Sequence, residues 1–113
     1  MAHQGTVNWP IGPNQTLAFE AHDANGPWNS VPGLYIFARP SGANWSAVYV
    51  GQADDLSTRL PNHNRLDEAV RAGATQIHAR VEHLQAERDR LERLLIQHLQ
   101  PPLNAQHRGG ILG

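Results

Sequence analysis

The chain has 113 residues with 40% hydrophobic content, which suits one domain with a single modest core and leaves no room for a second independent domain. It contains no cysteine, so a disulfide framework, a thiolate nucleophile and a cysteine-ligated zinc site are excluded. Nine arginines, no lysine and ten acidic residues give a net charge of −1, which excludes the strong overall basicity of many nucleic-acid-binding domains.

The first 30 residues are rich in Pro, Gly and Asn, with Trp9, Phe19 and Trp28 spread along them as hydrophobic anchors. Only residues 17–22 have the composition of a short regular element. Because Gly and Pro interrupt regular structure, we expect an irregular stretch here that wraps around its own domain. The expected organisation is this N-terminal wrap (residues 1–30), the main part of the domain (31–105) and a loose tail (106–113).

A hairpin is predicted next along the chain. Aliphatic and aromatic side chains alternate from Leu34 to Phe37, which is typical of a strand, and residues 40–44 break the pattern. Residues 47–51 supply the partner strand across that loop. A third strand is predicted over residues 77–81, where apolar residues at alternate positions indicate one buried face.

Two short helices are predicted between the second and third strands. Asp54 or Asp55 caps the first, which Pro61 interrupts because proline lacks the backbone donor and disfavours helix in the residue before it. The second begins after an N-cap at Asn64 and stops at Gly73.

The longest helix is predicted over residues 85–99. Leucines repeat on one stripe of it, and Pro101 follows its end. On its other side Arg88 and Glu92 stand four positions apart, the spacing of a helical ion pair.

The element order is strand, strand, helix, helix, strand, helix. This order is typical of an α+β fold. We therefore expect a small, mostly antiparallel three-stranded sheet flanked by helices.

Six short features stand in one order along the chain. They are Gly33-Leu34-Tyr35, Tyr49-Val50-Gly51, Arg59, His63, Glu92 and Asn104. Tyr49 precedes Arg59 by ten positions, Arg59 precedes His63 by four, and Glu92 precedes Asn104 by twelve. In this order and at these spacings the features resemble the GIY-YIG nuclease domain, over residues 33–104. The resemblance implies that fold and a phosphodiesterase that cuts nucleic acid with one divalent metal ion.

The resemblance makes Glu92 the ligand of a single Mg²⁺ or Mn²⁺ ion and Arg59 the residue that holds the scissile phosphate. Mg²⁺ accepts one or two protein carboxylates because it keeps several waters and takes phosphate oxygens. A planar, permanently charged guanidinium suits the charge that grows on the phosphate. From the residues alone, Glu92 could instead pair with Arg88, and Arg59 with Asp55.

The general base is left open between two side chains. The resemblance makes Tyr49 the base or a water-positioning group, with Tyr35 in support, although a phenol with a reference pKa near 10 is a poor base at pH 7. His63 is the easier base, because the reference pKa of imidazole is near 6.5. The alternative for both tyrosines is that they are half-buried strand aromatics.

Three further residues are assigned to phosphate binding or structural support, namely Gly51, Gln52 and Asn104. Asn104 would tie the end of the long helix back to the site, or would simply satisfy its own loop backbone. Gln52 departs from the pattern of that family, in which members such as the N-terminal nuclease half of the bacterial excision-repair incision subunit tend to carry lysine. Without that positive charge, we expect weaker binding of phosphate.

The sequence therefore predicts a divalent-metal-dependent endonuclease, a phosphodiester hydrolase that acts on DNA. Most of the arginines lie from Arg59 to Arg93 and could form a local basic face, or a surface laced with salt bridges. The alternative is a module of the same fold that binds nucleic acid or a protein partner without turnover, in keeping with the near-zero charge. A protein partner would then supply specificity.

The expected location is the cytoplasm, without a membrane partner. No stretch approaches the roughly 18 apolar residues of a membrane span. The first five residues have neither the positive charge nor the apolar run that begins a secretory signal.

Overall fold

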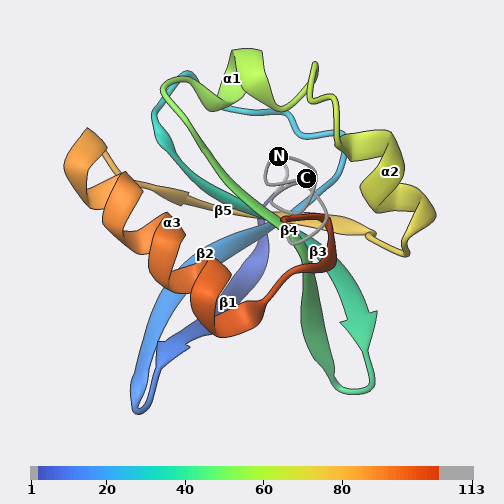
Figure 1. Cartoon of the computed structure of the whole chain (residues 1–113). Coiled ribbons are helices and arrows are strands. Elements are labelled where there is room, and N and C mark those ends of the chain that lie inside the picture. Colours follow the sequence, from blue (N-terminus) through green and yellow to red (C-terminus); the bar gives the residue numbers. More distant parts are fainter. Residues whose placement is uncertain (1–2, 105–113) are drawn as a thin grey trace, which may run out of the picture.

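Five antiparallel strands form one sheet in the computed structural model, which describes residues 3–104 (Figure 1). The strands are β1 (His3–Gly12), β2 (Gln15–Asp23), β3 (Gly33–Ser41), β4 (Asn44–Ala53) and β5 (Gln76–Val81). Their order across the sheet is β1-β2-β5-β3-β4, so the last strand along the chain lies in the middle. The predicted tail over residues 106–113 lies outside the described residues.

The helices cover both faces of the sheet. They are α1 (Leu56–Arg59), α2 (Leu66–Arg71) and α3 (Gln85–Leu99), followed by a helical turn over residues 102–104. α3 packs against both edge strands, β1 and β4, as well as against β3. One helix can contact both edges only if the sheet curls around it, and Figure 1 shows this half-barrel shape.

The predicted three-stranded sheet flanked by helices is wrong, because residues 3–23 form a β-hairpin in place of an irregular wrap. Pro10 is tolerated because β1 is an edge strand, where a missing N–H need not interrupt a ladder. Gly12 pairs with Gln15, and Asn14 takes the left-handed conformation with φ of 61° at the turn between them. Pro10 therefore lies on an edge strand and Gly12 lies beside a turn, so neither interrupts the hairpin.

The other predicted elements are present with small changes. α3 spans residues 85–99 as expected, and Asp55 caps α1 by accepting a hydrogen bond from the Ser57 N–H at 2.9 Å. The N-cap of α2 is Arg65 and not Asn64, without a side-chain cap. Gly73 follows its end with φ of 106°, the left-handed conformation that favours glycine.

The core has two clusters, one on each face of the sheet, because successive side chains of a strand point in opposite directions. β3 is buried on both faces from Gly33 to Ala38. Its Tyr35 and Phe37 pack on the side of α1 and α2, whereas Leu34 and Ile36 pack with α3. β5 is also buried on both faces, so the prediction of a single buried face for this strand is wrong.

A fully buried histidine explains that error. The Trp9 indole N–H donates to Nδ1 of His78 at 3.0 Å. Nε2 of His78 lies 2.9 Å from the Gln76 side-chain oxygen, so the neutral ring carries its proton there and donates it. Burial, with a smaller effect of His22, lowers the pKa of His78 to about 4. A polar residue with both ring nitrogens paired thus joins β1 to β5.

Replacing Gly33 tests how closely β3 approaches β5. A Cβ at Gly33 would collide with the backbone carbonyl oxygen of Arg80, so Gly33→Ala should destabilise the fold by about 1–3 kcal/mol. Gly12→Ala is the matched control, because the nearest atom to its added Cβ is the Gln15 side-chain oxygen at 3.8 Å. The midpoint of urea unfolding measures both. Equal stability of the two variants would contradict the close approach.

Candidate functional site

The pairing of β3 with β4 sets the aromatic part of the site. Tyr35 stands opposite Gly51, and Phe37 stands opposite Tyr49. The ring centroids of Tyr35 and Tyr49 lie 6.4 Å apart, and those of Phe37 and Tyr49 lie 5.6 Å apart. Val48 is the extra residue of a bulge, since the next pair joins Ala38 to Ala47. The two predicted tyrosines therefore share one face of the sheet.

Gly51 leaves the space that Tyr35 fills. A Cβ on Gly51 would lie 2.5 Å from the Tyr35 hydroxyl oxygen and 2.6 Å from the ring carbon that carries it. Any larger residue would push the phenol away. The predicted supporting role of Gly51 thus has a steric explanation.

His63 lies 7% exposed and holds the Tyr35 hydroxyl. Its ring packs edge-on against three aromatic rings, and its Nε2 lies 2.8 Å from the Tyr35 oxygen. Its Nδ1 accepts the backbone N–H of Arg65 at 2.9 Å. Because Nδ1 is an acceptor, the neutral ring carries its proton on Nε2 and donates it to Tyr35. The ring therefore has no unoccupied lone pair for a water.

The protonation states follow from burial and two nearby charges. Burial, with the charges of Arg59 and Arg65, lowers the pKa of His63 to about 4, so the ring is neutral at pH 7. Burial also raises the pKa of Tyr35; Tyr49 and Glu92 add to the rise and Arg59 opposes it. Burial raises the pKa of Tyr49 in the same way, with Arg59 opposing and Glu92 adding.

Arg59 lies exposed at the last residue of α1. It forms no ion pair with another residue of the described part of the chain. The alternative of a bridge to Asp55 is wrong, since that carboxylate accepts from Ser30 and Ser57. The charge of Arg59 lowers the pKa of Tyr35, Tyr49 and His63.

Glu92 lies half-buried on α3, and its partner is not Arg88. Its Oε1 accepts a hydrogen bond from Gln52 at 3.0 Å. Burial raises the pKa of the Glu92 carboxyl, and the hydrogen bond from Gln52 opposes that rise. The carboxylate borders a surface hollow of about 340 Å³, lined by Asp89, Glu92, Arg93, Ile96 and Gln97.

At the metal site that the resemblance implies, Glu92 would be the protein ligand of the divalent ion. Over residues 3–104, no three His, Cys, Asp or Glu side chains converge on one point. Mg²⁺ fits such a donor set because waters and substrate oxygens complete its octahedron. The Oε2 atom of Glu92, which takes no hydrogen bond from the described residues, is the oxygen that fits this role.

Asn104 ties the chain end after α3 to β4, as predicted. Its side-chain oxygen accepts the Val50 N–H at 2.8 Å, and its amide nitrogen donates to the Val50 carbonyl at 2.9 Å. The alternative that Asn104 satisfies its own loop backbone is therefore wrong. β4 is an edge strand, and Asn104 imitates a neighbouring strand at one residue of it.

Arg88 is the residue that sequence reasoning misjudged. The helical spacing placed it with Glu92, but it is 3% exposed and forms an ion pair with Asp54 at 2.8 Å. It also donates to Gln52, which was noted only as a departure from lysine. No spacing rule within one helix could reveal this, because its partners lie outside the helix interior, in residues 52–54 and 82–85.

Comparison of the chain with models of known protein families, with curated proteins and with solved structures finds no match. The resemblance in motif order therefore stays a prediction, and function has to be argued from the geometry of the site. Among the helices of residues 3–104, none has the length and apolar character needed to cross a membrane.

Removal of the Asn104 side chain tests its tie to β4. Asn104→Ala leaves the N–H and carbonyl of Val50 without partners in a buried position, so we expect a loss of about 2–4 kcal/mol. The measurement is urea unfolding, with a lower midpoint at an unchanged slope. The exposed Asn64→Ala serves as control and should change stability by less than about 0.5 kcal/mol. Similar losses in both variants would count against the tie.

The environment of His63 predicts its titration. Because its folded pKa is about 4 and its ordinary value is 6.5, the unfolded chain binds this proton first as pH falls. The contribution of neutral His63 to stability is therefore present above pH 6.5 and is lost between about pH 6.5 and 4. Proton and nitrogen NMR of the ring should show the proton on Nε2 and a midpoint near pH 4, and unfolding of His63→Gln should depend less on pH. A titration midpoint of His63 near pH 6.5 would contradict this prediction.

Proposed function

We propose that the chain is a phosphodiesterase that cleaves nucleic acid, with DNA as its substrate, using one Mg²⁺ or Mn²⁺ ion at Glu92. One observation carries the proposal. Tyr35 and Tyr49 share one face of two paired strands, and the charges of Arg59, which is exposed, and Glu92, which is half-buried, both act on their pKa values. These are the groups that the motif order predicts, brought together from β3, β4, α1 and α3.

Phosphodiester hydrolysis needs an oriented water, relief of charge on the phosphate oxygens and stabilisation of the leaving oxygen. A divalent ion, when bound, neutralises phosphate charge and lowers the pKa of a bound water. The carboxylate of Glu92 supplies the protein charge that attracts such an ion. Its partial burial strengthens that attraction, since water screens the charge less there.

Arg59 is suited to hold the substrate phosphate. Its guanidinium is exposed and has no carboxylate partner among residues 3–104, so no ion pair has to break before a phosphate binds. Its planar donors can hold two phosphate oxygens at once. The same charge then stabilises the additional negative charge of the transition state.

The tyrosines orient groups and do not remove protons in this proposal. Burial raises the pKa of both, so both are neutral at pH 7 in the metal-free protein. Tyr35 accepts from His63 and has its own proton left to donate. Tyr49 is less buried and is suited to orient the attacking water. His63 is therefore a positioning residue for Tyr35.

A second candidate function is a binding module that keeps the fold without turnover. The Gln52 amide in contact with Glu92, where the family resemblance leads one to expect a cation, favours this alternative, as does the net charge of −1. Such a module would bind nucleic acid through phosphate contacts that weaken steeply with salt. Salt-sensitive retardation of DNA without any cleavage would support the module over the enzyme, and absence of both would favour a protein partner.

Cleavage of supercoiled plasmid and of single-stranded and branched oligonucleotides with Mg²⁺ or Mn²⁺ tests the enzyme. Glu92→Gln and Arg59→Ala should each reduce cleavage by at least about 100-fold, because the first removes the charge that attracts the metal ion and the second removes the charge that holds the phosphate. Arg59→Ala should still bind Mn²⁺, and Tyr49→Phe should lose rate while binding DNA normally. The control is Glu87→Gln, which removes a carboxylate of the same helix that pairs with Arg90 outside the site.

The contrary outcomes are distinct. Wild-type cleavage no greater than that of Glu92→Gln on every substrate would contradict the proposal. Full activity of Tyr49→Phe together with a large loss in His63→Ala would assign the role of general base to His63, against the hydrogen bonds described above.

A further inference from the structure

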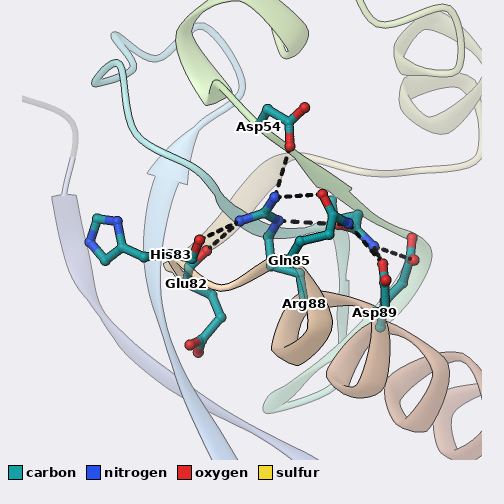
Figure 2. Close-up of polar contacts among 8 residues, drawn as sticks. Asp54, Glu82, His83, Gln85, Arg88 and Asp89 are labelled. Atoms are coloured by element: carbon teal, nitrogen blue, oxygen red, sulfur yellow. Dashed lines mark hydrogen bonds and ion pairs between the residues drawn. The ribbon is translucent and has the colours of Figure 1, made fainter.

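Arg88 is a buried cation whose donors are all used. A guanidinium has five N–H groups, and those of Arg88 meet five acceptors (Figure 2). The acceptors are the Gln52 side-chain oxygen (3.1 Å), the carbonyls of Glu82 (2.9 Å) and His83 (3.1 Å), an Asp54 carboxylate oxygen (2.8 Å) and the Gln85 side-chain oxygen (2.9 Å). They belong to the end of β4, the connection from β5 to α3, and the first turn of α3.

This arrangement determines which way the Gln52 amide points. Its oxygen accepts from Arg88 and from the Gln85 amide nitrogen at 3.0 Å. Its nitrogen therefore points the other way and donates to an oxygen of Asp89 at 2.7 Å and to Oε1 of Glu92 at 3.0 Å. Figure 2 shows Arg88 and Asp89 with the dashed contacts around them beside α3.

The opposite orientation of the amide would be costly. A flip would turn the amide hydrogens toward the guanidinium and the amide oxygen toward the carboxylates of Asp89 and Glu92. Both contacts would then be repulsive, and the Arg88 Nε–H would lose its acceptor inside the protein. The buried cation thus fixes the amide, and the amide fixes one oxygen of each carboxylate.

We propose that Arg88 is a positioning residue that acts through Gln52 to hold the Glu92 carboxylate in one rotamer, with Oε1 occupied and Oε2 available to a divalent ion. The catalytic meaning of this inference rests on the proposed function. Arginine is required because lysine has three donors and no planar fork, so it cannot meet the five acceptors at once. Partners one layer behind a metal ligand typically change metal affinity by 10–100-fold.

The test compares three variants with matched controls. Gln52→Met keeps the length of the side chain but removes both amide groups, and Arg88→Lys keeps the charge but loses the fork. The control for the first is Gln15→Met, at an exposed position in the β1–β2 hairpin. The control for the second is Arg90→Lys, an exposed arginine of the same helix. The third is the double variant Gln52→Met with Arg88→Lys. Thermal unfolding by circular dichroism confirms that each variant is folded.

The first readout needs neither metal nor activity. Side-chain scalar couplings of Glu92 in the metal-free protein report whether it occupies one rotamer or averages over several. We expect one rotamer in the wild type and both controls, and averaging in Gln52→Met and Arg88→Lys. An averaged Glu92 in the wild type, or a fixed Glu92 in Gln52→Met, overturns the inference. The Gln52→Met result decides it even if Arg88→Lys fails to fold.

The second readout is Mn²⁺ titration by calorimetry. Each single variant should bind Mn²⁺ 10–100-fold more weakly than the wild type. Because Arg88 acts through Gln52, the double variant should bind no more weakly than Gln52→Met alone. If the losses of Mn²⁺ affinity add up in the double variant, Arg88 does not act through Gln52, and the inference is overturned. A wild type that holds Glu92 in one rotamer but binds no Mn²⁺ contradicts the proposed function while supporting the positioning of Glu92.

Discussion

The pairing of Tyr35 with Gly51 is the contact on which the rest of the site depends. A shift of the β4 register by one residue would move Tyr49 to the face of the sheet opposite Tyr35. A side chain at position 51 would displace the Tyr35 hydroxyl from the place where His63 donates to it. The packing of the aromatic cluster and the hydrogen bond between His63 and Tyr35 both require this one close approach.

β4 connects that cluster to the helix that carries the carboxylate. It is an edge strand, and edge strands leave backbone groups unpaired. Here Asn104 pairs with one residue of the edge, while Gln52 reaches across to α3. Gln52 contacts Glu92, and Val50 contacts Asn104. The strand β4 therefore holds both ends of residues 92–104. The same strand supplies Tyr49, so the distance between phenol and carboxylate is fixed by short connections.

Local sequence signals were enough to predict part of this arrangement. The alternation around Tyr35, the cap at Asp55 and the leucine stripe of residues 85–99 each depend on neighbours within one element, so those elements were predicted correctly. The β1–β2 hairpin was missed because Pro10 and Gly12 were read as breakers, and their meaning depends on an edge position and a turn. Arg88 was misjudged because its burial and its acceptors depend on how the end of β4 meets the start of α3 in space.

The most direct test of the central claim is a crystal of this protein soaked in Mn²⁺, with the ion located by its anomalous scattering. The account predicts one peak within about 2.0–2.3 Å of the Glu92 carboxylate, on the side that faces Tyr49 and Arg59, with waters in the remaining positions. The same peak should be missing from crystals of Glu92→Gln. A peak elsewhere, or no peak at Glu92 under saturating Mn²⁺, would contradict the account.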